Sequence, residues 1–364
     1  MKTIFLAQEI YSKFGGIQRF NVRLVDALKE FAGADGKFDA DVVIRRDSLK
    51  DVPVTSTRVR LEACDGSAVR FSIAAIRSAW SARRIVLGHI NLLPLGVIIK
   101  MMRPRIRVLL IAHGIEVWGD DSFRKYKWWE PVALRLCVSR VLAVSDYTAQ
   151  QFCRCTEYPA AQLTIFPNVV DADASFDEVF PGGAGTQILT VTRLGKSEEK
   201  KRVDAVIAAV AELKKIDVDV NLHIVGDGEL RPGLEEFAAS LGVQSNVVFH
   251  GRVSDEQLNA LYKSADVFVL PSEKEGFGIV YLEAWKAGLP VVAARATAVP
   301  EVIDDGIDGI LVSPVSPLTL SAALKDLLGS GSLRARMVNA GRKKILEKFN
   351  HGAFVKRLGV LLSD

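Results

Sequence analysis

Residues 265–301 read ADVFVLPSEKEGFGIVYLEAWKAGLPVVAARATAVPE and contain the strongest structural signal in the chain. The apolar, β-branched run from Asp266 to Leu270 predicts a buried strand. Apolar residues return at helical spacing from Phe277 to Ala287, and the run from Val291 to Ala294 predicts a second strand. The segment is therefore a βαβ unit. The loop after its first strand lies at the edge where open α/β sheets bind ligands.

Two carboxylates eight positions apart, Glu275 and Glu283, belong to this unit. The backbone around Gly276, Phe277 and Gly278 lies at the start of the predicted helix, where free amide groups and the helix dipole favour a phosphate. The alternative is a solvated acidic loop followed by an ordinary surface glutamate. Against that alternative, Glu283 lies between apolar neighbours, and a carboxylate placed there needs a partner.

The pattern Pro-Ser-x-x-Glu-Gly-Phe-Gly-x-x-x-Leu-Glu-Ala-x-x-x-Gly-x-Pro-Val-Val-Ala resembles the hallmark Glu-x7-Glu block of the retaining glycosyltransferases of family 4. The resemblance implies a GT-B fold, an α/β architecture with two Rossmann-like domains facing across a cleft. It also implies that Glu275 contacts the donor sugar and that Glu283 binds the nucleotide ribose.

Length and composition agree with two globular domains. The chain has 364 residues, 49% of them hydrophobic and 25% charged, which predicts two domains of ordinary size. A net charge of +4 fits an anionic ligand or an acidic membrane surface and does not call for nucleic acid. The four cysteines show no metal-binding spacing and are expected to be free thiols, as in a cytoplasmic protein. The N-terminus predicts a first strand rather than a signal peptide, and no stretch predicts a transmembrane helix.

The first domain is predicted over residues 1–171. Gly15 and Gly16 follow the first strand, where a glycine turn allows backbone amides to approach a phosphate, although a plain tight turn explains them as well. The resemblance places this loop against the donor phosphates. His113 follows a buried strand beginning at Val108, and residue type alone leaves a structural role open; the resemblance assigns it to the active site, facing the donor sugar.

A basic and aromatic segment follows, from Trp118 to Trp129. Lys and Arg interleaved with Trp is typical of sugar-stacking surfaces and of membrane interfaces, whereas a helix that buries its Trp side chains is the plainer alternative. Together with the arginines between Arg83 and Arg107, it predicts a peripheral contact with an anionic membrane.

The second domain is predicted over residues 188–345, after a Gly-rich linker at 172–187. The final residues, 346–364, are predicted as a helix that crosses back to the first domain, as in GT-B folds. The resemblance assigns Arg193 and Lys201 to the donor diphosphate, while the longer loop and Arg202 in place of a usual glycine leave Lys200 as an alternative to Lys201. It also places Arg252 and Val253 beside the nucleotide base.

The resemblance implies transfer of a hexose from a nucleotide sugar to a saccharide or a polyprenyl-diphosphate-linked saccharide, with retention. GDP-mannose is the expected donor and a UDP-sugar the alternative. A nucleotide-sugar epimerase and a non-catalytic nucleotide-sugar-binding subunit are the two competing functions. No cofactor or metal is expected, because the Asp-x-Asp triplets lie away from the predicted second-domain loops. The expected location is the cytoplasm, at the inner face of a membrane.

Overall fold

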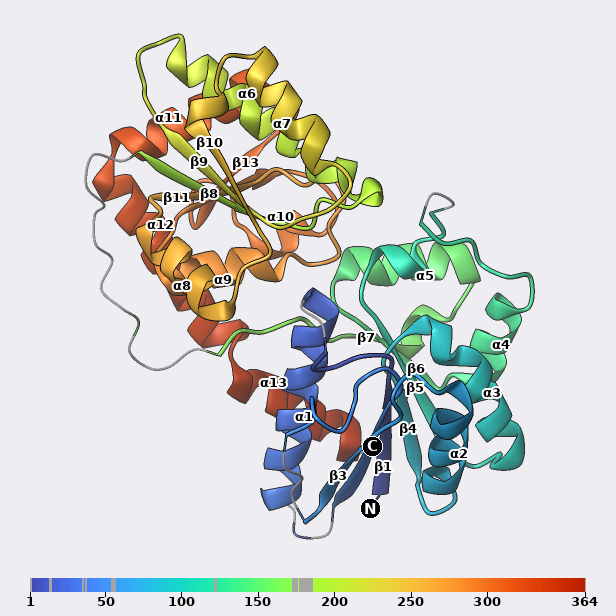
Figure 1. Cartoon of the computed structure of the whole chain (residues 1–364). Coiled ribbons are helices and arrows are strands. Elements are labelled where there is room, and N and C mark those ends of the chain that lie inside the picture. Colours follow the sequence, from blue (N-terminus) through green and yellow to red (C-terminus); the bar gives the residue numbers. More distant parts are fainter. Residues whose placement is uncertain are drawn as a thin grey trace. The chain divides into compact units, whose positions relative to one another are not determined.

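The chain folds as two compact units, which the computed structural model describes over residues 2–12, 15–34, 36, 38–53, 57–120, 123–171, 176 and 186–363 (Figure 1). Unit 1 comprises Met1–Val169 together with His351–Asp364, and unit 2 comprises Val170–Asn350. Most of the predicted linker at 172–187 lies outside the described residues.

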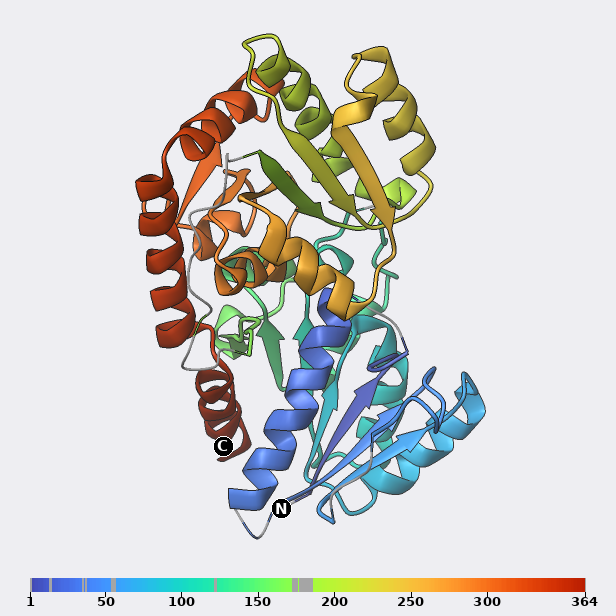
Figure 2. The same cartoon turned by 60° about the vertical axis from the view of Figure 1, so that its left-hand side comes forward.

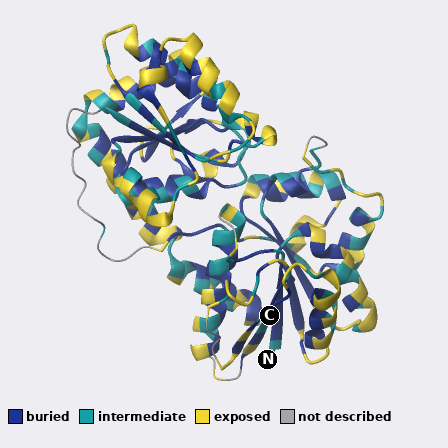
Figure 3. Cartoon of the chain, in the orientation of Figure 1, coloured by how far each residue is buried: buried dark blue, intermediate teal, exposed yellow. Residues whose placement is uncertain are grey.

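Unit 1 is built on a parallel sheet in the order β3-β2-β1-β4-β5-β6-β7. The strands are β1 (Lys2–Ala7), β2 (Asp39–Ile44), β3 (Val59–Ala63), β4 (Arg84–Leu87), β5 (Arg107–Ala112), β6 (Arg140–Ala143) and β7 (Leu163–Ile165). The central strands are buried along nearly their whole length (Figure 3). Burial on both faces explains why their sequences are continuous apolar runs rather than alternating ones.

The helices of unit 1 are α1 (Gly16–Ala34), α2 (Ala68–Ala79), α3 (Leu93–Met102), α4 (Glu130–Cys137), α5 (Asp146–Thr156) and α13 (His351–Ser363). The last helix lies beside α1 (Figures 1 and 2). Phe354 of α13 is fully buried, with ring centroids 5.5 Å from Phe20 and 4.6 Å from Phe166. The C-terminal residues therefore complete the core of the N-terminal unit.

Unit 2 is a second parallel sheet, in the order β10-β9-β8-β11-β12-β13. Its strands are β8 (Gln187–Val191), β9 (Asn221–Val225), β10 (Val247–Gly251), β11 (Val267–Leu270), β12 (Val291–Ala294) and β13 (Gly309–Val312). Its helices are α6 (Val203–Lys214), α7 (Arg231–Ser240), α8 (Asp255–Ser264), α9 (Ile279–Ala287), α10 (Val299–Val302), α11 (Pro317–Gly329) and α12 (Gly331–Lys348). Numbered within each unit, both strand orders begin 3-2-1-4-5-6, the Rossmann order, which reverses direction beside the first strand.

The predicted βαβ unit and the two Rossmann-like domains are confirmed. The stretch from Ile85 to Met102, predicted as a strand followed by an interrupted apolar run, is β4 and then α3, with Pro94 in the first turn of the helix, where proline is tolerated. The predicted closing segment at 346–364 divides differently. Helix α12 continues to Lys348 in unit 2, and α13 begins at His351 in unit 1.

Across the described residues, no helix has the length and apolar character needed to cross a bilayer. All four cysteines are free thiols.

Candidate functional site

The loops after β8 and β11 meet where the strand order of unit 2 reverses, the usual ligand position in open α/β sheets. Lys201 Nζ lies 2.6 Å from Glu275 Oε2, and the two side chains are only 14% and 16% exposed. The residues are 74 positions apart, so the pair exists only in the folded sheet. A mostly buried cation and carboxylate therefore lie side by side at this edge.

The two neighbouring lysines, Lys200 and Lys201, have different environments. Lys200 is 66% exposed and lies 3.5 Å from Glu273, in contrast to the mostly buried Lys201. Arg202, which stands in place of the glycine of the family pattern, adopts the left-handed conformation with a φ of 56°. Its guanidinium bonds Asp204 and, at 2.9 Å, Glu273. These bonds hold a conformation that is unfavourable for a residue with a Cβ.

The Glu275 loop is fixed by Thr297, which follows β12 and was not predicted as a site residue. The Glu275 amide donates to Thr297 Oγ1 at 3.0 Å, and the Thr297 hydroxyl donates to the Glu275 carbonyl at 3.0 Å. Thr297 has a φ of 47°. A left-handed threonine is uncommon and indicates local backbone strain held by its surroundings.

Two glycines after β9 allow that turn to lie against the loop after β8. Gly226 has a φ of 134°, and a Cβ there would come 1.7 Å from the Thr192 carbonyl oxygen. Gly228 has a φ of 154°, and its Cβ would come 2.3 Å from Leu194. Arg193, between these contacts, has a side chain that is 73% exposed and forms an ion pair with Glu198. The close backbone packing thus presents Arg193 at the carboxyl edge of the sheet.

The Gly276–Gly278 segment leads into α9. Gly278 has a φ of 85° at the N-cap, and a Cβ there would lie 2.3 Å from the Tyr281 ring. Phe277 is buried, with its ring centroid 5.6 Å from that of Phe349. Phe277 therefore anchors the segment, and any ligand contact from it comes through the backbone.

Glu283 is half-buried on α9, and the Tyr262 hydroxyl of α8 donates to its Oε2 at 3.4 Å. Arg252 and Val253 follow β10, with Arg252 exposed and Val253 half-buried. All the second-domain residues predicted for the site lie on loops at the carboxyl edge of the unit 2 sheet or on α9, which starts there.

In unit 1, His113 directly follows β5, and its Nε2 lies 3.0 Å from the Gly88 carbonyl oxygen. Because a carbonyl only accepts, Nε2 carries the proton and Nδ1 is left as an acceptor. Burial lowers the pKa of His113 to about 3, with a further contribution from His89. The ring also contacts the edge of Phe20 at a centroid distance of 5.0 Å. His113 is therefore a neutral imidazole at physiological pH.

The glycine loop of unit 1 lies partly outside the described residues, which omit residues 13 and 14. Gly16 begins α1, and the Gly15 carbonyl accepts from the Arg19 amide at 3.0 Å. Asp47, after β2, was not predicted as a site residue. Its Oδ2 accepts from the amides of Ile10 and Tyr11 at 3.0 and 2.7 Å, so it holds the start of the same loop.

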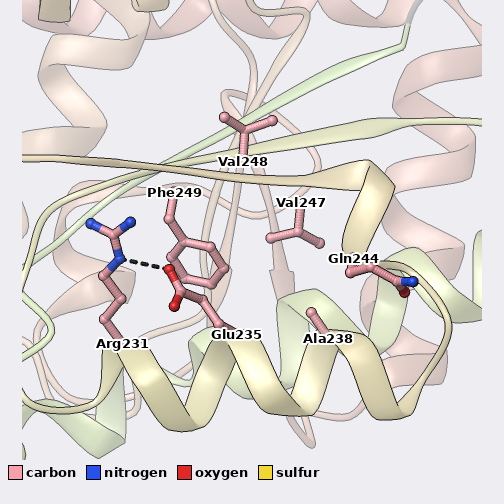
Figure 4. A pocket seen from close by; sticks show the side chains of 7 residues that line it. All are labelled: Arg231, Glu235, Ala238, Gln244, Val247, Val248 and Phe249. Carbon is pink, nitrogen blue, oxygen red and sulfur yellow. Dashed lines mark hydrogen bonds and ion pairs between the residues drawn. The ribbon is translucent and has the colours of Figure 1, made fainter.

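A pocket of about 290 Å³ lies elsewhere in unit 2, between α7 and β10 (Figure 4). Arg231 lies 2.7 Å from Glu235 and over the Phe249 ring at 5.8 Å. None of its lining residues was predicted for the site, and its chemistry is that of a helix packed beside an edge strand.

Two parallel, Rossmann-ordered sheets define the GT-B class, and solved structures of that class match the whole chain. Sucrose-phosphate synthase from Thermosynechococcus elongatus matches with a TM-score of 0.79 and 18% identity over 100% of this chain and 98% of the other. Anabaena HepE in complex with UDP and glucose matches with a TM-score of 0.77 and 19% identity over 100% and 99%.

In sequence, the chain resembles the family 4 type of glycosyltransferases in both units. Residues 14–174 match the model of Glycosyltransferase Family 4, and residues 177–344 match that of Glycosyl transferases group 1. A GDP-mannose-dependent alpha-(1-6)-phosphatidylinositol monomannoside mannosyltransferase of Mycolicibacterium smegmatis is 34% identical over 61% of this chain and 62% of its own length. An uncharacterized glycosyltransferase of Methanocaldococcus jannaschii is 33% identical over 58% and 56%. The matched region thus spans less than two thirds of these relatives.

Proposed function

We propose that the protein is a retaining glycosyltransferase that moves a hexose from a nucleotide sugar to a hydroxyl of a saccharide or lipid-linked saccharide, in polysaccharide or glycolipid assembly. The observation that carries the proposal is the mostly buried Lys201–Glu275 pair at the switch point of unit 2. A lysine paired there with a carboxylate can exchange that partner for a diphosphate, which leaves the carboxylate to accept from sugar hydroxyls.

In this proposal Lys201, Arg193 and the backbone at Gly276–Gly278 neutralise the charge that develops on the leaving diphosphate. Preorganised cations and amides of this kind can supply much of the rate enhancement. The anomeric carbon–oxygen bond to the diphosphate breaks while the acceptor oxygen bonds to the anomeric carbon on the same face, and the proton of the acceptor hydroxyl passes to the leaving diphosphate. In this proposal no metal takes part in the reaction. We therefore expect transfer activity to be unchanged in excess EDTA, and loss of activity would contradict a metal-independent reaction.

The donor that we propose is GDP-mannose. The similarity to mannosyltransferases supports it, including a relative described as GDP-mannose-dependent. A UDP-sugar is the alternative, supported by the fold likeness to HepE in complex with UDP and glucose. Glu283 holds the ribose, with Arg252 and Val253 beside the base.

The first test is thermal stabilisation by a panel of nucleotides and nucleotide sugars. A ligand at about 100 times its dissociation constant stabilises by about 2.7 kcal/mol. We expect GDP-mannose and GDP to shift the wild type and Glu236→Ala, an exposed helix glutamate of the same unit, but not Glu283→Ala. If only UDP compounds raise the unfolding temperature, the proposed donor changes from GDP-mannose to a UDP-sugar. No shift with any nucleotide would contradict the site.

Two other functions fit the same fold. A nucleotide-sugar epimerase would convert the donor without releasing nucleotide diphosphate. A non-catalytic subunit would bind the donor but show neither transfer nor slow donor hydrolysis. Nucleotide release in the presence of an acceptor identifies the transferase, and conversion of the donor without that release distinguishes the epimerase from the non-catalytic subunit.

We also propose that unit 1 contacts the inner face of an anionic membrane through a basic-apolar face. This face comprises the exposed apolar side chains of Val69, Ile73, Trp80, Ile98, Met101, Met102, Trp128, Val132 and Leu136. Trp128 is 90% exposed and Leu136 is 76% exposed. Helices α2, α3 and α4 are neighbours in the unit, and they carry exposed positions (Figure 3). Exposed arginines on α2 and α4 include Arg70, Arg77 and Arg135. Apolar side chains among cations are typical of interfacial binding.

Cosedimentation with liposomes tests the face. We expect binding to anionic vesicles at low salt, and loss of that binding in the double variant Met101→Ser/Leu136→Ser. Ile307→Ser, which replaces a 59% exposed residue of unit 2, is the matched control. Equal binding to neutral vesicles would contradict the electrostatic part. The membrane assignment would be contradicted if the wild type bound no vesicles but self-associated, and if the double variant lost that self-association.

A further inference from the structure

Three arginines and a histidine gather where the strand order of unit 1 reverses, outside the residues assigned above. Arg45 and Arg46 directly follow β2, and their amides donate to the carbonyls of Ala7 and Gln8 at the end of β1. His89 follows β4 on the other side of β1. The carboxyl ends of three neighbouring strands thus bring these side chains to one edge.

Arg124 joins the cluster through Asn91, close to His89 in sequence. The Asn91 amide donates to His89 Nδ1 at 3.1 Å, and Arg124 Nε donates to Asn91 Oδ1 at 3.2 Å. With Nδ1 occupied, neutral His89 carries its proton on Nε2 and remains a donor. Arg124 and Arg46 both lie close enough to His89 that their charges, added to burial, lower its pKa to about 4.

Some N–H groups of these arginines have no hydrogen-bond acceptor among the described residues. Arg124 Nη1 and Arg45 Nε are buried and have no hydrogen-bond partner among the described residues. Arg45 contacts the Gln8 amide oxygen at 3.4 Å and no carboxylate in the described part of the chain. A buried guanidinium N–H without an acceptor is costly, so such a group indicates a partner that binds from outside.

The nearby carboxylates do not cancel these cations. Asp47 is occupied by the Ile10 and Tyr11 amides and by the Ser12 hydroxyl at 2.6 Å. Glu9 pairs with Arg46, and Glu130 Oε1 accepts from Arg124 Nη2 at 2.5 Å. Glu116, a third carboxylate near Arg124, is buried and accepts from the amides of His113 and Gly114. Within the described ranges, three guanidinium groups therefore share Glu9 and Glu130 as their ion-pair partners.

We propose that Arg46, His89 and Arg124 bind a phosphate group of the acceptor beside His113. The inference rests on the proposed function, because it assumes that unit 1 receives the acceptor. His113 is tied to this cluster by its bond to Gly88, the residue before His89. Donors from three chain segments, two of them the charged guanidinium groups of Arg46 and Arg124, suit a phosphate ester or phosphodiester, whose oxygens accept from several directions. The acceptor class is a phosphorylated sugar or polyol, either soluble or linked through its phosphate to a lipid.

The direct test is a titration with inorganic phosphate, followed by the imidazole NMR signals of His89. His223 and His250 of unit 2 report any binding there and serve as an internal control. We expect the His89 signal to shift saturably in the wild type. The affinity should fall about tenfold in Arg46→Gln, the typical loss for one charge-assisted hydrogen bond. Arg46 has a 53% exposed side chain, so this variant is expected to fold.

Arg83→Gln is the matched control, because Arg83 is an exposed arginine just before β4, at the opposite end of that strand from His89. A His89 signal that phosphate does not move would overturn the proposal. An equal loss of affinity in both arginine variants would overturn it as well, because it would show non-specific attraction by net charge.

Transfer assays then compare a soluble with a lipid-linked phosphate, and whichever of these two acceptors gives the higher kcat/KM identifies the source. With the donor found by thermal stabilisation, we expect a higher kcat/KM for mannose 1-phosphate or for a prenyl-phosphate-linked sugar in vesicles than for methyl mannoside. Arg46→Gln should lose this preference while donor binding stays intact. Equal kcat/KM values for phosphorylated and unphosphorylated acceptors would overturn this inference but leave the proposed glycosyltransferase function standing. No transfer with any donor or acceptor contradicts the proposed function, while the phosphate titration still tests the cluster.

Discussion

Lys200 and Lys201 are adjacent in sequence, yet their side chains have opposite environments. Lys201 is mostly buried against Glu275, and Lys200 is mostly exposed beside Glu273. Burial strengthens the interaction of a cation with a developing negative charge, because there is less water to screen it. The difference in environment therefore favours Lys201 as the diphosphate ligand.

We expect Lys201→Met to lower kcat/KM by about 100-fold, as for removal of one preorganised donor, and Lys200→Met to change it less than about threefold. Steady-state kinetics with the identified donor measures both. Lys201→Met also leaves Glu275 without its cation, so thermal stability should fall and should recover in the double variant Lys201→Met/Glu275→Gln without recovery of activity. Equal kinetic effects of the two single variants would contradict the assignment.

The protonation of His113 makes a second prediction at this scale. Its pKa is lowered from 6.5 to about 3, so between these values the unfolded chain binds a proton that the folded chain does not. Folding stability contributed by the neutral ring is present above pH 6.5 and is lost as the pH falls toward 3. His113→Gln should reduce the loss of unit 1 stability between pH 7 and 4.5 by about 2 kcal/mol. Urea unfolding followed by hydrogen exchange of unit 1 peptides measures it. An NMR titration that places the His113 pKa near 6.5 would contradict the prediction.

The turn after β9 is the element on which the geometry of the β8 loop depends. Gly226 and Gly228 both have positive φ, and a Cβ on either would overlap the backbone of residues 192–194. Since backbone atoms cannot move aside as a flexible side chain does, any substitution displaces the loop that bears Arg193.

Gly226→Ala should therefore destabilise unit 2 by about 2 kcal/mol or more and weaken nucleotide binding. Gly233→Ala is the matched control. Gly233 lies in α7 with nothing within 4 Å of the added Cβ, and alanine in a helix stabilises by up to about 1 kcal/mol. Thermal unfolding with and without nucleotide measures both variants. If Gly226→Ala changed neither the stability of unit 2 nor nucleotide binding, the turn would be able to move without a cost in free energy, and the prediction would be wrong.

At the scale of the whole molecule, the chain returns to its first unit after completing the second. Phe354 of α13 packs against Phe20 and Phe166, and Phe20 in turn contacts His113. The C-terminal helix thus supports the core layer directly behind a candidate site residue.

Phe354→Ala should destabilise unit 1 by about 3 kcal/mol, the usual cost of removing a buried phenylalanine, and leave unit 2 unchanged. Hydrogen exchange of peptides from each unit distinguishes the two. Val360→Ala, at a 62% exposed position on the same helix, should change stability by less than about 0.5 kcal/mol. Loss of protection in unit 2 instead would contradict the assignment of α13 to unit 1.

The resemblance of the Glu-x7-Glu block to a known family implied the two Rossmann-like domains. The sequence by itself determined the βαβ unit around Glu275 and Glu283 and the position of His113 after a buried strand. Each depends on local signals, namely apolar runs, helical spacing and glycine turns, which act over a few residues. Contacts between residues far apart in the sequence have no such local signal. The Lys201–Glu275 contact, the two hydrogen bonds between Thr297 and Glu275, and the gathering of Arg45, Arg46, His89 and Arg124 were decided only by the tertiary structure. Each of them depends on which strands lie side by side, and strand order follows from packing of the whole sheet rather than from any one segment.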